Sequence, residues 1–210
     1  MIHERQKEEE VDSATYGVGS FLLEIVKVFL LAVIIIFPVR VFLFQPFFVQ
    51  GASMEPNFYD GEYLIVNEWR YKKTTIGLKE SPIFQVEPSK ELSRGDVVVF
   101  RYPKNPSQFF VKRVIGLPGE RIHIENSFIM IFNSEHPDGM ILDEEEYLEK
   151  AAKAKDSSSF TLKDDEYFVM GDNRQHSHDS RSWGPLQKEF VIGKVVLRAW
   201  PIDRVKSFFK

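Results

Sequence analysis

The chain has 210 residues, a formal net charge of -4 and no cysteine. The lack of cysteine excludes disulfides, thiol catalysis and cysteine-ligated zinc, and a chain without a broad basic field is not expected to bind nucleic acid. After an N-terminal tail and an apolar segment, about 165 residues remain, which is enough for one domain with its own hydrophobic core.

An apolar segment runs from Phe21 to Leu43. As a helix it would be about 35 Å long, compared with roughly 30 Å for the hydrocarbon core of a membrane. Three charged residues, Glu24, Lys27 and Arg40, interrupt it. Glu24 and Lys27 lie three residues apart near one end, where they can pair and reach water. The segment is therefore long enough to span a membrane.

A cleaved signal peptide is the alternative interpretation, because Val28 to Val39 carries no charge and has the length of a signal-peptide core. The tail before the segment is acidic, however, and no Ala-x-Ala site follows it. The sequence therefore favours a tail at residues 1–19 and one retained transmembrane helix at residues 20–43. A slight excess of basic residues on the N-terminal side predicts a cytoplasmic N-terminus.

Downstream of this segment, short β-branched and aromatic runs are bounded by Gly, Pro, Asn or Asp. Residues 44–210 are therefore predicted to be mostly β. Three exceptions are expected: a helix at residues 143–155, a long surface insertion at residues 74–91 and a flexible loop at residues 155–159. The predicted strands lie at residues 61–66, 95–100, 109–115, 121–124, 127–132, 167–170 and 191–199.

The first motif with chemical content is Gly51-Ala52-Ser53-Met54-Glu55-Pro56, a few residues after the apolar segment. A serine hydroxyl is inert at neutral pH unless a neighbouring base takes its proton. Taken alone, Ser53 is best explained as an ordinary loop serine.

Lys112 is the candidate base for Ser53. Strand alternation places it with Phe110 and Val114 on one apolar face. A lysine of ordinary pKa, about 10.4, is neutral roughly once in a thousand molecules near pH 7.4, so catalysis requires the pKa to fall by ~3. Burial can lower a lysine pKa by that much. The alternative is a lysine that extends its ammonium group to water from a sheet edge.

The third motif is residues 171–184, which are dense in turn residues, charges and hydroxyls. Such a loop can supply a hydroxyl that orients Lys112, and carboxylate–guanidinium pairs can hold it together. The alternative is a surface loop with scattered ion pairs.

Together, the three motifs resemble those of the bacterial type I signal peptidases in their short, single-span form. Residues 53–56 are similar to the nucleophile motif of that family, residues 112–120 to its lysine motif and residues 171–181 to its closing motif. The resemblance implies a membrane-anchored Ser/Lys endopeptidase that removes signal peptides and uses no cofactor or metal. It also implies that residues 44–210 form an all-β catalytic domain of antiparallel sheets, partly barrel-like.

The resemblance assigns a role to each matching residue. Ser53 would attack the scissile carbonyl, Lys112 would accept its proton, and Ser177 would hydrogen-bond and orient Lys112. The substrate would lie next to Gly51, Met54 and Pro56. Supporting roles would fall to a set of charged and amide side chains, of which the last two would form an ion pair: Asp172, Asn173, Arg174, Asp179 and Arg181.

The resemblance also implies partners and a location. The substrates would be signal-peptide-bearing preproteins, bound as an extended strand along a sheet edge, with small residues at the first and third positions before the cut. Cleavage sites emerge on the outer side of the cytoplasmic membrane, so the catalytic domain is expected to be extracytoplasmic. The aromatic residues at positions 42–48 are expected to contact membrane phospholipid.

Two features depart from the family pattern. Gly51 stands where some members carry a serine whose hydroxyl helps bind the oxyanion, so backbone amides, including that of Ser53, are expected to replace it. The insertion between Glu125 and Glu166 is shorter than in members that have a larger second β-domain.

Two other interpretations of the third motif are weaker. His178, Asp179 and Ser180 are the residue types of a serine protease triad, but three consecutive side chains point in different directions. His176 and His178 could ligate a metal together with Asp172 or Asp179, yet their spacing is unspecific.

Two rival functions also stay open at this point. A self-cleaving, repressor-type Ser/Lys protease would share the core, but it would work in the cytosol without an apolar span. A non-catalytic, membrane-tethered β-domain that binds exported chains would be favoured if Lys112 were exposed and far from Ser53.

Overall fold

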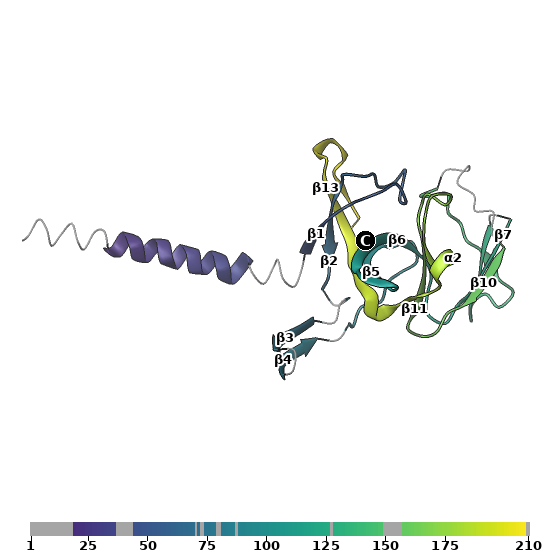
Figure 1. The fold of residues 1–210 in the computed structure, drawn as a ribbon, viewed down its shortest axis with the longest axis horizontal. Coiled ribbons are helices and arrows are strands. Elements are labelled where there is room, and N and C mark those ends of the chain that lie inside the picture. The colour runs from purple at the N-terminus through teal and green to yellow at the C-terminus, as the bar shows by residue number, and fades with distance from the viewer. Residues whose placement is uncertain are drawn as a thin grey trace, which may run out of the picture. The chain divides into compact units, whose positions relative to one another are not determined.

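The computed structural model describes residues 19–36, 44–69, 71, 74–78, 81–86, 88–126, 128–148 and 157–208 (Figure 1). Contacts within the chain divide it into two units, with the boundary between Leu43 and Phe44.

The described residues of the first unit form a helix, Gly19–Ile36, which is long and apolar enough to cross a membrane and has no buried residue. This confirms the prediction of a single N-terminal apolar helix. Residues 1–18 of the predicted tail and residues 37–43 of the predicted span lie outside the described residues. Its length and apolar composition are those of a membrane span.

The second unit is built on an eight-stranded antiparallel sheet. Its strands run in the order β1-β2-β13-β5-β6-β11-β12, and β14 pairs with β13. Among the described residues, β1 pairs only with β2 and β12 only with β11, so the sheet is open. The expected antiparallel all-β fold is confirmed, but the partly barrel-like closure is not. The strands are β1 (Phe44–Phe48), β2 (Tyr63–Asn67), β5 (Val97–Tyr102), β6 (Asn105–Gly116), β11 (Glu166–Met170), β12 (Leu186–Gln187), β13 (Val191–Trp200) and β14 (Lys206–Ser207).

A four-stranded antiparallel sheet packs beside β6 and β11, with the order β10-β7-β8-β9 (Figure 1). Its members are β7 (Arg121–Glu125), β8 (Phe128–Phe132), β9 (Met140–Ile141) and β10 (Ser158–Thr161). The remaining elements are the hairpin β3 (Thr74–Leu78) and β4 (Ser81–Val86), the short helix α2 (Ser180–Trp183), and two 3-10 turns, Lys188–Phe190 and Ile202–Arg204.

Three local predictions differ from the structure. The surface insertion at residues 74–91 contains the β3–β4 hairpin. The expected flexible loop at residues 155–159 ends in β10, because Ser158 and Ser159 pair with β7. In place of a helix at residues 143–155, residues 143–148 form a turn in which the Leu148 amide donates to the Glu144 carbonyl, and residues 149–155 lie outside the described part.

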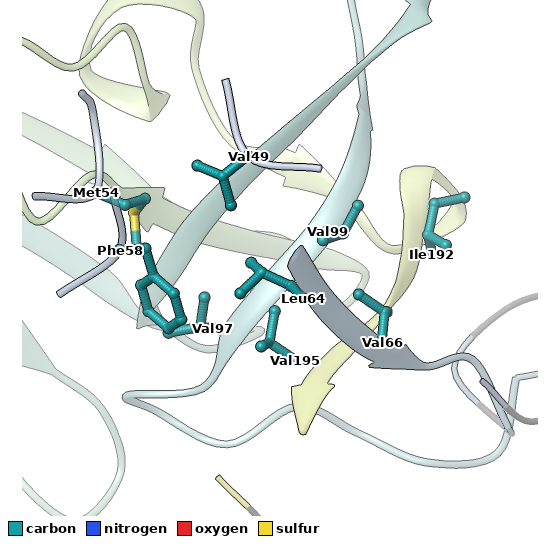
Figure 2. Close-up of a cluster of buried hydrophobic side chains, with 9 residues drawn as sticks. All are labelled: Val49, Met54, Phe58, Leu64, Val66, Val97, Val99, Ile192 and Val195. Atoms are coloured by element: carbon teal, nitrogen blue, oxygen red, sulfur yellow. The ribbon is translucent and has the colours of Figure 1, made fainter. Parts of the chain in front are cut away.

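One hydrophobic cluster lies directly under the predicted nucleophile. Val49 and Met54, on either side of Ser53, are 3% and 1% exposed. Figure 2 shows Met54 beside Phe58, in a cluster that also contains Leu64 and residues of β5 and β13. Because the chain is buried at both ends of this turn, the residues between them are held at the surface in a fixed position.

Met54→Ala is expected to lower the free energy of unfolding by about 2–5 kcal/mol, because it opens a cavity in this cluster. Met54→Leu keeps the volume and should cost less than about 1.5 kcal/mol. Urea unfolding of the detergent-solubilised chain, followed by circular dichroism, measures both. Equal and small losses would show that Met54 does not anchor the turn.

Candidate active site

The candidate nucleophile, Ser53, lies in a tight turn after β1. Gly51 has a φ of 86°, a conformation that glycine adopts without strain, and its amide donates to Asp60 Oδ1 at 2.7 Å. On the other side of Ser53, the Phe58 amide donates to the Met54 carbonyl at 2.9 Å. These bonds, with the buried Met54, fix the backbone that presents the Ser53 hydroxyl.

Lys112 lies on β6, opposite Val98 of β5, and is 4% exposed. Its Nζ donates to Ser53 Oγ at 2.7 Å and to the Val111 carbonyl at 2.8 Å. The Phe110 ring centroid is 5.4 Å from Nζ. The fold thus brings two side chains 59 positions apart in the sequence into direct contact, and the alternative of a lysine extended to water is excluded.

Burial lowers the pKa of Lys112 from 10.5 to about 8, while the charges of Asp179 and Asp172 act in the opposite direction. Burial dominates because an ammonium group without water loses most of its hydration energy. A substantial fraction of Lys112 is therefore neutral near physiological pH and able to accept a proton.

Asp179 and Arg181 form the predicted ion pair. Arg181 Nε donates to Asp179 Oδ1 at 2.8 Å, and Nη2 donates to Oδ2 at 2.9 Å. Burial would raise the pKa of Asp179, but the bonds and charge of Arg181, with the Gly171 amide at 3.0 Å, hold that pKa below its ordinary value. Asp179 also accepts from the Arg181 amide as the N-cap of α2. The pair therefore closes the loop of residues 171–181 on itself.

Asp172 is fully buried, and its partner is Arg113, which the sequence did not indicate. Arg113 Nε donates to Asp172 Oδ1 at 2.8 Å, and Nη2 donates to Oδ2 at 2.6 Å. Strand alternation placed Arg113 on the opposite face of β6 from Lys112, which is correct. Strand alternation could not show which acidic side chain of a distant loop would form the ion pair with Arg113.

Asn173 connects the loop of residues 171–181, here called the closing loop, to the turn of residues 51–58 that carries Ser53, here called the nucleophile turn. Its amide donates to the Ser53 carbonyl at 3.0 Å, and its Nδ2 donates to the Ala52 carbonyl at 3.1 Å. Gly171 touches the same carbonyl of Ser53, and a Cβ at this position would collide with it and with Ser177 Oγ. Only glycine allows this approach of the two segments.

Ser177 lies near the pair but does not make the predicted contact. Its Oγ is buried next to Gly171 and faces Asp179, where it helps to hold the pKa of that carboxyl below its ordinary value. Its role in orienting Lys112 stays a prediction.

Arg174 is bonded to a residue outside the three motifs. Its two terminal nitrogens donate to the two carboxylate oxygens of Glu144, and Nε donates to the Gly171 carbonyl at 3.1 Å. Glu144 was assigned to the acidic start of a predicted helix at residues 143–155, and this charge pattern gave no signal of a buried partner.

A groove of about 710 Å³ runs past Ser53 and Lys112. One wall is residues 47–53 and the other is residues 107–112, with Leu64 and Val99 between them and His176 and His178 also on the lining. Of the three residues predicted beside the substrate, Gly51 lines this groove. Met54 points into the core instead, and Pro56 lines a second cavity.

The two minor interpretations of the third motif gain no support. His178 Nε2 lies 3.1 Å from Tyr102 Oη, and His176 Nδ1 lies 3.2 Å from Asn173 Oδ1. Asp179 is bonded to Arg181 and not to His178, so it forms no triad. Within the described parts of the chain, no three His, Asp or Glu side chains converge on a metal position.

Comparison with known proteins gives the family. The model of the family "Signal peptidase, peptidase S26" matches residues 22–200. Signal peptidase I P of Bacillus subtilis subsp. natto is 34% identical over 197 residues, which cover 89% of this chain and 94% of that protein. The chain belongs to the signal peptidase family S26. Signal peptidase IB of Staphylococcus aureus (strain Mu50) is 32% identical over 204 residues, covering 90% and 94%.

A crystal structure of a signal peptidase I from Enterococcus faecalis aligns with 50% of this chain and 97% of its own, with 29% identity and a TM-score of 0.41. Membership of the family makes the chain a serine endopeptidase of the signal peptidase type. Its N-terminal apolar helix is consistent with membrane anchoring.

Lys112→Met is expected to stabilise the fold at neutral pH. The pKa of Lys112 is 10.5 in the unfolded chain and about 8 in the folded protein. Burial of its ammonium group therefore lowers the free energy of unfolding by about 3 kcal/mol below pH 8, and this loss disappears as the pH rises to about 10.5. Methionine removes that cost but loses two hydrogen bonds, so the net gain should be about 1–3 kcal/mol at pH 7. Urea unfolding at pH 7 measures it.

The matched control is Lys104→Met, on the exposed turn between β5 and β6, which should not stabilise the protein. The gain from Lys112→Met should also shrink as the pH rises from 8 to 10.5. A destabilised Lys112→Met protein would mean that the ammonium group is well solvated in the fold.

Proposed function

We propose that this enzyme removes N-terminal signal peptides from exported preproteins with a Ser53–Lys112 dyad. The observation that carries the proposal is the 2.7 Å hydrogen bond from a buried Lys112 Nζ to Ser53 Oγ. It also argues against a non-catalytic tethered domain, which would leave Lys112 exposed and distant. The apolar helix argues against a cytosolic repressor-type protease.

In the first step, neutral Lys112 accepts the Ser53 proton while Oγ attacks the scissile carbonyl. The resulting lysine ammonium then protonates the leaving amine, and an acyl-enzyme remains on Ser53. In the second step, a water molecule gives its proton to neutral Lys112 and attacks the ester, and the lysine ammonium then returns that proton to Ser53 Oγ as the ester bond breaks and the signal peptide leaves with a free carboxylate. With a pKa of about 8, roughly one molecule in five has neutral Lys112 at pH 7.4.

The oxyanion is best stabilised by the Ser53 amide. Within the described chain, this amide donates no hydrogen bond, so it is available to the negative oxygen that forms beside Oγ. Gly51 offers no hydroxyl, and its own amide is bonded to Asp60. The enzyme would therefore rely on backbone donors for this part of catalysis.

The groove suits an extended peptide. β11 pairs with β6 only at Arg113, Val114 and Gly116 among the described residues, so the same edge of residues 108–112 is open to a substrate strand. Residues one and three before the cut would then face the same wall, since alternate side chains of a strand share a face. Such a shared wall would explain a preference for small residues at both positions.

The location follows from the substrate and the anchor. We place the N-terminus in the cytoplasm, one span in the cytoplasmic membrane and the β-rich unit outside, where signal-peptide cleavage sites emerge. Phe48, Tyr63 and Trp200 give the β-rich unit an aromatic surface: each is about half exposed, Phe48 and Tyr63 rings are 5.0 Å apart, and Trp200 pairs with Tyr63 in register. Phospholipid headgroups are the partner that such amphipathic rings favour.

The proposal is tested by cleavage of a detergent-solubilised preprotein with an Ala-x-Ala site. The intact chain should cut after the second alanine, and Ser53→Ala and Lys112→Ala should lower kcat/KM by at least about 10³-fold, as loss of a nucleophile or its base does. Circular dichroism checks that both variants fold. Undiminished cleavage by either folded variant would rule out the dyad.

Substrate variants test the groove in the same assay. Leu in place of either alanine should abolish cutting, whereas Leu at the residue between them should be tolerated because that side chain faces the other way. If Leu is accepted at the first and third positions, the shared wall is not what selects the substrate.

Trp200→Ser should reduce turnover of a preprotein embedded in lipid vesicles several-fold and leave cleavage of a short soluble peptide unchanged. The reason is loss of an interfacial aromatic ring without any change in the groove. Phe128→Ser is the matched control, because Phe128 is 52% exposed but lies on the four-stranded sheet. Equal effects of the two variants would count against lipid contact at Trp200.

A further inference from the structure

Residues 144–147 follow β9 and lie in the short insertion between Glu125 and Glu166. We propose that this segment, here called the strap, positions the proposed Ser53–Lys112 dyad through Glu144 and Tyr147. These two residues join the closing loop and the nucleophile turn to β6, the strand that carries Lys112 and is here called the base strand. The inference rests on the proposed Ser53–Lys112 function and adds two positioning residues to it.

Glu144 holds the closing loop. It pairs through both carboxylate oxygens with Arg174, and the two side chains are 13% and 2% exposed. Arg174 in turn donates to the Gly171 carbonyl, at the point where the loop touches the Ser53 carbonyl. The position of Gly171 against the nucleophile therefore depends on a carboxylate from the strap.

Tyr147 holds the nucleophile turn. Its hydroxyl donates to Glu144 Oε1 at 2.9 Å, and its carbonyl accepts from Asn57 Nδ2 at 2.6 Å. The same Asn57 nitrogen lies 2.9 Å from Asp172 Oδ2. Asn57 follows Ser53 by four positions, so one amide connects the turn, the strap and the closing loop.

The base strand reaches the strap through Arg113. Its guanidinium group lies over the Tyr147 ring, 4.1 Å from the centroid, while it forms the two-bond pair with Asp172. Because Arg113 is the next residue after Lys112, the strap supports β6 directly behind the base. A cation over an aromatic ring in a poorly hydrated site is worth more than one at the surface.

The charges that face Lys112 give the strap a measurable effect. Asp172 and Asp179 lie close enough to act on it, each paired with an arginine, and His176 and His178 share its groove. A loosened strap would admit water to Lys112 and weaken the neutralisation of Asp172 by Arg113. Both changes favour the ammonium form, so both would raise the pKa of Lys112.

The test compares Glu144→Gln with Glu145→Gln in the full chain. Glu145 is exposed and adjacent, so the control makes the same charge change on the solvent side. For Glu144→Gln, the acid limb of the kcat/KM profile should move up by about 0.5 pH unit or more. Activity should then fall about threefold at pH 7 and recover above pH 9. Glu145→Gln should match the unmodified enzyme.

A purely structural role is distinguished by the same profile. If Glu144→Gln lowers thermal stability but its acid limb overlays that of the unmodified enzyme, the proposal is overturned. If Glu144→Gln does not fold, Tyr147→Phe decides the question, because it removes only the hydroxyl that holds Glu144. Its acid limb should move in the same direction, and an unchanged limb would overturn the proposal.

A second readout separates the strap from the dyad. The titration of Lys112, followed by NMR of chain labelled at lysine Cε, needs no cleavage. Failure of the unmodified enzyme to cut preprotein would count against the proposed function alone. An identical Lys112 titration in Glu144→Gln and Glu145→Gln would count against the strap, whatever the cleavage results.

Discussion

The arrangement of this site depends on excluding water from the Lys112 ammonium group, although the carboxylates of Asp172 and Asp179 lie close to it. Water exclusion lowers the pKa of Lys112 to about 8, whereas Asp179 and Asp172 favour the charged form. Each carboxylate carries its own arginine, Arg181 and Arg113 respectively, with two hydrogen bonds per pair. These pairs offset the charges that would otherwise keep Lys112 protonated. Removing one partner of such a buried pair typically costs 3–5 kcal/mol, so the loop that carries the acids is strongly constrained.

β6 links this electrostatic arrangement to the fold. Its first half forms a wall of the groove, Lys112 faces Ser53, and Arg113 reaches the acids on the opposite face. Farther along, Val114 and Ile115 enter two different hydrophobic clusters, and Ile115 packs with the four-stranded sheet. Lys112 is thus placed by a strand whose later residues pack into two hydrophobic clusters. In the proposed function, the small sheet and its insertion would support the Ser53–Lys112 dyad in addition to enlarging the core.

Local patterns predicted much of this arrangement, and nonlocal contacts account for what was missed. Strand periodicity placed Lys112 on an apolar face and Arg113 on the other, because side-chain alternation is a property of the strand alone. The partners of Arg113 and Arg174 could not be predicted, since an acidic residue in a distant segment carries no mark of which arginine it meets. Glu144 was missed for this reason: its acidic neighbourhood also fits the first turn of a helix. The open sheet and the β3–β4 hairpin depend on pairings that short strand signals do not specify.

In the proposed function, a neutral, buried Lys112 makes Ser53 a nucleophile. This dependence is measured by the single-turnover rate at which an activated ester of a signal-peptide sequence acylates the enzyme at different pH values, with the adduct located by mass spectrometry. We expect an adduct on Ser53, formed with a rate that rises through a midpoint near pH 8. An adduct on another residue, or a midpoint near 10.5, would contradict it.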